Sequence, residues 1–305
     1  MPLPHLRLKP VLFSWCGCLL GWFSQHLRGW VGAERIVGPR FGEDVAVTGA
    51  RPAWFQTTII VPVGTGSAVV RDIFRDIYRS ARQLGIALTG GHTEVSPAVR
   101  QPIVAGDTQG LVSRGALVTS AGARAGDAVI LTKAAAIEGT SIIARRFPGG
   151  ARDVLGKRGQ QIAARFHHRP GISVVAAALL AARHGASAMH DPTEGGVAAG
   201  LFELAAAARV RVCIDIDEVP VLPQTEKLCS YFGLRPLGLI GPGALLLTIA
   251  SAQVDSLLRA LRRRDIPAAC SGTVARGRGV EARSGGKRCR FVWSARDELT
   301  KLFAP

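Results

Sequence analysis

The sequence predicts an α/β protein with two α/β layers, organised in two halves. Short apolar runs typical of buried strands alternate with longer segments of helical periodicity along 305 residues. Apolar residues make up 48% of the chain, and 36 glycines and 17 prolines provide many tight turns. This length is sufficient to bury a full core, in one large domain or two medium ones. The alternation of strands and helices makes layered α/β architecture the favoured fold class.

The first half of the chain predicts a strand, a helix and two more strands. Residues 57–62 (TTIIVP) are rich in β-forming residues and predict a buried strand. The helix that follows has its apolar residues on one face and ends at Gly85. Residues 86–88 predict a strand that leads into a glycine loop, and residues 102–111 predict a further strand pairing near it. An Ala- and Gly-rich loop at 120–126 marks the boundary between the halves.

The second half continues the alternation. Thr193 offers the N-cap of a helix from Glu194 to about Ala208. The polar, glycine-rich residues 147–159 predict a surface excursion. The other expected elements are strands at 127–133, 186–189, 211–216, 244–249 and 268–274, and helices at 138–146, 172–184 and 253–264.

Two glycine-rich acidic loops are the strongest functional signal. They are the segments Leu88–Glu94 (LTGGHTE) and Met189–Gly196 (MHDPTEGG), and each follows a short apolar run. Glycine lets backbone N–H groups approach an anion closely, and the start of a helix adds partial positive charge. Carboxylates in such loops suit Mg²⁺, which prefers hard oxygen ligands and bridges to phosphate. The loops therefore predict a nucleotide site assembled from two halves of one fold.

The chain is strongly basic, with 38 basic residues against 22 acidic ones and a net charge of +16. The arginines are scattered singly, and the one run, Arg262–Arg264, ends an expected helix, where cations interact favourably with the helix dipole. This distribution is typical of a composition bias rather than of a nucleic-acid-binding face. We therefore expect no nucleic-acid partner, although a basic chain attracts polyphosphate substrates.

Six scattered cysteines show no metal-ligand spacing apart from Cys16-Gly17-Cys18. In a chain of this length they are typical of small buried residues in a reducing cytosol, so a cytoplasmic location is expected. The uncharged stretch Val11–Phe23 is too short to span a bilayer as an ordinary helix. It fits three alternatives: a misassigned start or poorly ordered leader, a packed terminal helix, and a signal or anchor. A membrane role is not expected.

Further motifs occur in the order of a known family. They are Val37–Asp44, Gly49–Phe55, Gly90–Pro97, Leu131–Ala144, Met189–Gly196, Pro236–Ile240, Gly243–Leu246 and Arg296–Leu299. With them the chain resembles the AIR synthase-related, PurM-like superfamily of ATP-binding proteins, which includes aminoimidazole ribonucleotide synthetase, selenophosphate synthetase, thiamine-monophosphate kinase and HypE-type hydrogenase maturation factors. The resemblance implies two α/β domains with ATP and Mg²⁺ between them. The expected division is a leader at 1–32, an N-terminal domain at 33–120 and a C-terminal domain at 121–305.

The resemblance also implies roles for individual residues. Asp44 and Asp191 would be metal ligands, although Asp191 also suits a turn before Pro192. His92 and His190 lie beside the glycine loops and are weak candidates for a general base, against the alternative of an orienting hydrogen-bond donor. The residues expected to contact nucleotide are Gly90, Gly91, Lys133, Glu138, Thr193, Gly195 and Gly196. For the lysine of this set, a solvated charge at a strand edge is an equal alternative.

The sequence departs from the family pattern near residues 44–49. Asp44–Pro52 joins two motifs that relatives separate by several strands, which carry an Asp-Pro pair of the metal site and help to form a barrel between subunits. Losing a carboxylate leaves phosphate charge uncompensated, and phosphoryl transfer depends on that compensation. Two functions therefore stay open: an ATP/Mg-dependent enzyme that activates a small substrate by phosphoryl transfer, and a catalytically impaired relative that binds a nucleotide or a partner. A homodimer is likewise open.

Overall fold

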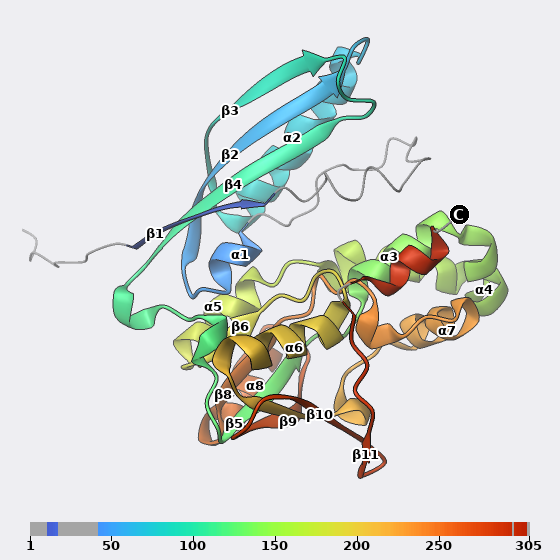
Figure 1. Ribbon diagram of the computed structural model, residues 1–305. Helices are drawn as coiled ribbons and strands as arrows, with labels where there is room; N and C mark the ends of the chain where they lie inside the picture. The colour runs from blue at the N-terminus through green and yellow to red at the C-terminus, as the bar shows by residue number, and fades with distance from the viewer. Residues whose placement is uncertain (1–10, 18–41, 295, 304–305) are drawn as a thin grey trace, which may run out of the picture. The chain divides into compact units, whose positions relative to one another are not determined.

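The computed structural model describes residues 11–17, 42–294 and 296–303, with residues 11–17 described in their backbone only (Figure 1). The chain divides into two compact units, Met1–Leu117 and Val118–Pro305. Each unit has its own sheet.

The N-terminal unit is a four-stranded sheet with the order β1-β4-β2-β3. The strand β2 pairs antiparallel with β4 and parallel with β3. The helix α2 covers this sheet, because Ile73 and Ile77 of α2 pack with Phe55 and Ile59 of β2 in one buried cluster. Its elements are β1 (Val11–Gly17), α1 (Glu43–Ala46), β2 (Arg51–Pro62), α2 (Ser67–Leu84), β3 (Ala87–Ser96) and β4 (Ile103–Val112). The predicted end of α2 is confirmed, since Gly85 takes the left-handed conformation that closes a helix.

The first expected glycine loop is wrong, because Leu88–Glu94 lies inside the exposed edge strand β3. Gly91 lies opposite Thr57 of β2, and a Cβ atom on Gly91 would lie 2.2 Å from the Thr57 carbonyl oxygen. The missing side chain therefore allows the two strands to approach. Doubled glycines look like a loop in a sequence, but here one of them is required by strand pairing.

The apolar N-terminal stretch contributes a strand rather than a helix. β1 pairs antiparallel with β4, with Val11 opposite Val112 and Gly17 opposite Gly106. The alternative of a terminal helix is therefore wrong for residues 11–17. The rest of the expected stretch, residues 18–23, lies outside the described residues.

The C-terminal unit is built on a seven-stranded sheet with the order β11-β10-β7-β9-β5-β8-β6 (Figure 1). Val197, Leu201 and Leu204 of α6 pack with Val129 and Leu246 of the central strands in one buried cluster. The strands are β5 (Asp127–Thr132), β6 (Ala188–His190), β7 (Arg211–Asp215), β8 (Leu246–Ala250), β9 (Ala268–Ala275), β10 (Gly279–Ser284) and β11 (Lys287–Cys289). The helices are α3 (Ile137–Arg146), α4 (Pro148–Ala164), α5 (Val175–Arg183), α6 (Gly196–Ala208), α7 (Pro223–Phe232) and α8 (Val254–Arg262).

The expected surface excursion at 147–159 is wrong, because residues 148–159 belong to α4 and Phe147 is its N-cap. Pro148 begins the helix, a position at which its missing N–H costs nothing. A Cβ atom on Gly150 would lie 2.9 Å from the Tyr231 ring of α7, so this glycine lets the two helices pack closely. Glycine lowers helix propensity, and tertiary packing overrides that preference here. The elements α7, β10 and β11 were not predicted at all.

In the part of the chain that the structure describes, no helix is both long enough and apolar enough to cross a membrane.

Candidate functional site

The turn between β6 and α6 requires both of its glycines. Gly195 and Gly196 have φ angles of +76° and +61°, which L-residues with a side chain rarely adopt. A Cβ atom on Gly196 would lie 2.5 Å from the Leu239 carbonyl oxygen, and one on Gly195 would lie 2.5 Å from the Ser294 carbonyl oxygen. The glycines therefore let two distant backbone segments pack against the start of α6. We call residues Asp191–Gly196 the glycine turn.

The expected cap by the Thr193 side chain is wrong, and α6 begins two residues later than predicted, at Gly196. The N-cap residue is Gly195, and no side chain caps it. The Thr193 carbonyl oxygen instead accepts the N–H groups of Gly196, at 3.0 Å, and of Gly241, at 3.1 Å. With Gly195 in the left-handed conformation, the chain turns into the helix through its backbone alone.

The loop Pro236–Gly243 links the glycine turn to the first turn of α3. Gly241 donates its N–H to Thr193, and Gly139 of α3 donates its N–H to the Ile240 carbonyl oxygen at 3.2 Å. Glu138 precedes this Gly139 and is half-buried. Two helix starts that were expected to contact nucleotide thus adjoin one loop.

A carboxylate from the C-terminal segment holds the glycine turn. Asp297 Oδ2 accepts the Gly195 N–H at 2.8 Å, and its Oδ1 accepts the Leu299 N–H at 2.8 Å. Burial raises the pKa of Asp297 to about 6, against the backbone N–H groups of Leu299, Gly195 and Ile240, which lower it. This side chain thus joins the glycine turn, the loop Pro236–Gly243 and its own segment.

The neighbouring carboxylate, Glu298, fastens the same segment to a different part of the loop. Its oxygens accept hydrogen bonds from the Arg235 backbone N–H at 3.1 Å and from the Arg235 Nε at 2.9 Å. Lys301 Nζ donates to it at 2.5 Å. Although burial raises the pKa of Glu298, these partners outweigh burial and hold it below its ordinary value. Asp297 and Glu298 therefore have separate partners.

His190 is tied to α6 by an ion pair. Its Nε2 lies 2.6 Å from Oε2 of Glu203. Burial lowers the pKa of His190, but the hydrogen bond and the charge of Glu203, together with Asp191, outweigh burial and raise it. The histidine expected as a base is thus bound to a carboxylate that favours its protonated form.

Lys133 adopts a left-handed conformation, with φ +56°, at the end of β5. Its ammonium donates to the carbonyl oxygens of Gly171, at 2.7 Å, and Ser173, at 2.8 Å, which precede α5. These contacts exclude the alternative of a merely solvated edge charge. They show that the lysine orders this connection.

The remaining expected residues lie in the N-terminal unit. Asp44 is half-buried in α1, and Gly90, Gly91 and His92 are exposed on β3. His92 Nε2 lies 3.7 Å from the Glu94 carboxylate. Among the described residues, no group of three or more His, Cys, Asp or Glu side chains could hold a metal ion.

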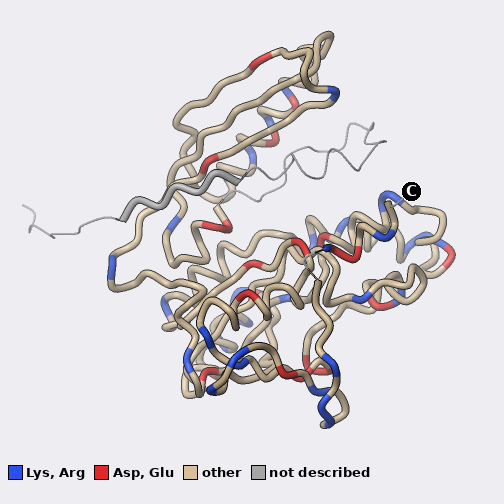
Figure 2. The backbone as a smooth tube through the Cα atoms, in the orientation of Figure 1, with Lys and Arg blue, Asp and Glu red and all other residues tan. Residues whose placement is uncertain are grey.

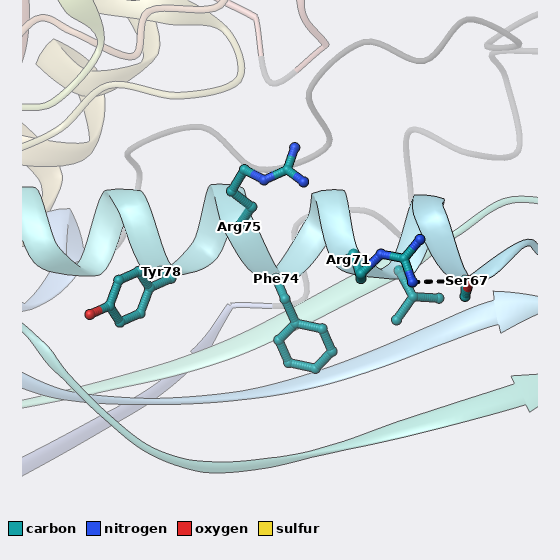
Figure 3. A pocket seen from close by; sticks show the side chains of 6 residues that line it. Ser67, Arg71, Phe74, Arg75 and Tyr78 are labelled. Atoms are coloured by element: carbon teal, nitrogen blue, oxygen red, sulfur yellow. Dashed lines mark hydrogen bonds between the residues drawn. The ribbon is translucent and has the colours of Figure 1, made fainter.

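The structure also shows features that are not part of the glycine turn. A groove follows one face of α2, with Phe74 and Tyr78 beside Arg71 and Arg75; the hydrogen bond from Arg71 to Ser67 crosses its end (Figure 3). Basic residues lie along both units, interspersed with acidic ones (Figure 2). None of the groove residues belongs to the expected site.

The sequence interpretation missed Asp297, Glu298 and Glu203. Asp297 lies 102 positions from Gly195, so no local pattern connects them. The available signal was the family-like stretch Arg296–Leu299, which indicated a family position but not a contact.

Comparison with known proteins shows the family to which the chain belongs. Residues 29–112 match the model described as AIR synthase related protein, N-terminal domain, and residues 124–284 match the model of the C-terminal domain. The chain is 31% identical to the carbamoyl dehydratase HypE of Cupriavidus necator, over 72% of this chain and 60% of that protein. It is 30% identical to the carbamoyl dehydratase HypE of Rhodobacter capsulatus, over 82% of this chain and 70% of that protein. The matches thus span 60–70% of these relatives' lengths.

The fold is also similar to solved structures. A crystal structure of the hydrogenase maturation protein HypE in complex with ATP superposes with a TM-score of 0.71 and 19% identity, covering 96% of this chain and 87% of that one. The predicted PurM-like α/β architecture is thereby confirmed. Since both halves match in order, the chain belongs to the AIR synthase related protein family.

Proposed function

We propose that the protein binds ATP with Mg²⁺ and transfers the γ-phosphoryl group to an oxygen of a small substrate, releasing ADP. The observation that carries this proposal is the glycine turn, a backbone turn with two glycines at positive φ at the start of the buried helix α6, with half-buried Asp191 and Thr193 in it. Such a helix start favours the binding of anions. Family membership and the ATP complex of a structural neighbour support the choice of nucleotide.

The residues present suit a magnesium ion held mainly by phosphate. Mg²⁺ in nucleotide sites usually keeps several waters and takes one or two protein carboxylates plus phosphate oxygens, so a cluster of three acidic side chains is not needed. Asp191, in the glycine turn, is the proposed ligand in the C-terminal unit, and Asp44 is the proposed ligand in the N-terminal unit. Bound Mg²⁺ would neutralise charge on the transferring phosphoryl group.

The proposed roles of the other residues follow from their contacts. Gly195 and Gly196 shape the turn, and Thr193 contacts nucleotide through its half-exposed side chain. Glu138 lies at the second helix start on the loop Pro236–Gly243. Lys133 orders the connection before α5. Because His190 is paired with Glu203, its proposed role is to orient the turn rather than to act as a base.

A second candidate function is nucleotide or partner binding without turnover. It is favoured by the hydrogen bond from the Gly195 N–H to Asp297, because this N–H then donates within the protein and not to a phosphate. The junction Asp44–Pro52, which joins two family motifs directly, points the same way. A cytoplasmic location belongs to both proposals, and under both the question of a homodimer stays open.

The two candidates differ in the formation of ADP. We would measure ADP release from MgATP with and without small carbamoyl compounds, a class suggested by the relatives named carbamoyl dehydratase. The enzyme proposal predicts substrate-dependent ADP release that Asp191→Ala abolishes and Asp153→Ala, an exposed residue of α4, leaves intact. Nucleotide binding with no ADP formation by the intact chain would instead favour the second candidate.

A further inference from the structure

The C-terminal unit contains a buried carboxylate, Asp297, that accepts a hydrogen bond from the backbone N–H of a glycine. Asp297 is 4% exposed, and its Oδ2 accepts the N–H of Gly195, the N-cap residue of α6. Anions are favoured at helix starts, and here the protein supplies one of its own. Because the N-cap residue is a glycine, it has no side chain of its own to cap α6.

The backbone of the glycine turn is costly to order without a contact from outside the turn. Glycine loses more backbone freedom on ordering than any other residue, and this turn places two glycines in sequence at positive φ. If ligand binding had to order them, the affinity would fall by the cost of that ordering. A fixed acceptor on Gly195 removes this cost before the ligand arrives.

The segment Asp297–Leu302, which we call the C-terminal turn, positions Asp297 for this contact. Its second oxygen accepts the Leu299 N–H, which fixes the carboxylate plane. The neighbouring Glu298 accepts hydrogen bonds from Arg235 and Lys301. The segment Asp297–Leu302 is therefore fixed by contacts that do not involve the glycine turn. The Gly238 backbone packs against the Glu298 side chain, where a Cβ atom would lie 2.9 Å from its Cγ.

We infer that Asp297 is a positioning residue for the nucleotide site, which fixes the glycine turn by accepting the Gly195 N–H and so makes the C-terminal turn part of that site. This inference rests on the proposed function for its ligand, but the contact between Asp297 and Gly195 can be tested without nucleotide.

The test compares Asp297→Asn with Asp127→Asn, a control in β5 that is also a buried aspartate accepting a backbone N–H, with its hydrogen bonds to Arg124 and Ser187 and not to the glycine turn. The first readout is hydrogen exchange of a peptide covering residues 193–199, and the second is the Kd for MgATP. We expect Asp297→Asn to speed exchange at the Gly195 amide and to weaken MgATP binding by about tenfold, which is the order of the cost of fixing one residue's backbone. Asp127→Asn should change the Kd by less than about threefold, which is under half of that cost.

The outcomes separate the inference from the proposed function. Unchanged exchange and Kd in Asp297→Asn would overturn the inference. Tighter binding would also overturn it, because Asp297 would then compete with phosphate instead of positioning the turn. If the intact chain binds no MgATP, the proposed function and the nucleotide part of the inference both fail, whereas exchange still shows whether Asp297 fixes the turn.

A measurement on the unaltered chain covers the case in which Asp297→Asn does not fold. Protonation removes one acceptor oxygen, so Gly195 protection relative to that of Leu201, inside α6, should fall between pH 7.5 and pH 5. The charged groups facing Asp297 are Glu194 of the glycine turn and Glu298, whose charge is paired with Arg235 and Lys301. A ratio that does not change with pH would contradict the inference.

Discussion

Replacing Gly196 by alanine tests the geometry of the glycine turn. Gly196 has φ +61°, and an added Cβ atom would lie 2.5 Å from the Leu239 carbonyl oxygen and 2.6 Å from that of Leu237. The left-handed conformation costs an alanine about 1–2 kcal/mol, and overpacking a buried position costs about 1–3 kcal/mol. Both opposing atoms belong to the backbone and cannot rotate away. We therefore expect Gly196→Ala to lower the free energy of unfolding by about 3 kcal/mol.

Thermal unfolding followed by circular dichroism measures this change. For a unit of this size, about 3 kcal/mol corresponds to a decrease in Tm of roughly 6–12 °C. The matched control is Gly185→Ala, because Gly185 has φ +83° but no atom within 4 Å of the added Cβ. The control should lose only about 1–2 kcal/mol, from backbone strain alone. If Gly196→Ala is no less stable than Gly185→Ala, the close packing of the loop Pro236–Gly243 on the turn is refuted.

Three further predictions follow from single contacts. Gly91→Ala should destabilise the N-terminal unit by about 1–3 kcal/mol, because its Cβ would meet a carbonyl oxygen of β2. Gly90→Ala is the control and should be nearly neutral, since nothing lies within 4 Å of its added Cβ. Equal effects of the two substitutions in urea unfolding would restore the loop interpretation. Lys133→Met should lower the free energy of unfolding by about 2–3 kcal/mol, because it removes two hydrogen bonds from an ammonium group. The control Lys157→Met, at an exposed position, should lower it little. A Lys133→Met protein as stable as the unaltered chain would show that the carbonyl contacts contribute nothing. Burial raises the pKa of Asp297 from 3.8 to about 6. Between these pH values the folded state therefore binds more protons than the unfolded state. As pH rises through this window, the contribution of Asp297 to the free energy of unfolding should fall by about 3 kcal/mol. Asp297→Asn should lack this pH dependence, and identical stability profiles from pH 4 to 7 would contradict the assignment.

The sequence predicted elements well where one local pattern dominated. In α2 the apolar residues Ile73 and Ile77 fall on one helical face and are buried as the spacing requires, and Gly85 closes the helix. The central strands β5 and β9 both formed close to their expected limits, and β5 is a buried, mainly apolar run. In these segments propensity, periodicity and packing agree.

Prediction failed where glycine had a packing role rather than a turn role. Gly91 lies within β3 because it lets β2 approach, and Gly150 lies within α4 because it lets α7 approach. In a sequence, such glycines look the same as those of a loop. The partner that decides between the two roles is more than thirty residues away in both cases.

The candidate site was predicted in part. The glycine turn at Asp191–Gly196 is present at the start of α6, but the backbone contacts that hold it depend on segments far along the chain. Asp297 was missed for this reason, since its bond to Gly195 links residues 102 positions apart. The left-handed conformations of Lys133 and Ala136 were likewise unpredictable, because they depend on tertiary contacts.

Isothermal titration of the intact chain with ATP, with and without Mg²⁺, measures whether the proposed nucleotide site exists. We expect magnesium-dependent binding that is lost in Asp191→Ala and kept in Asp153→Ala, with all three proteins folded. Binding that survives in Asp191→Ala would contradict the metal role of this carboxylate. A folded chain that binds no MgATP would contradict the nucleotide site itself.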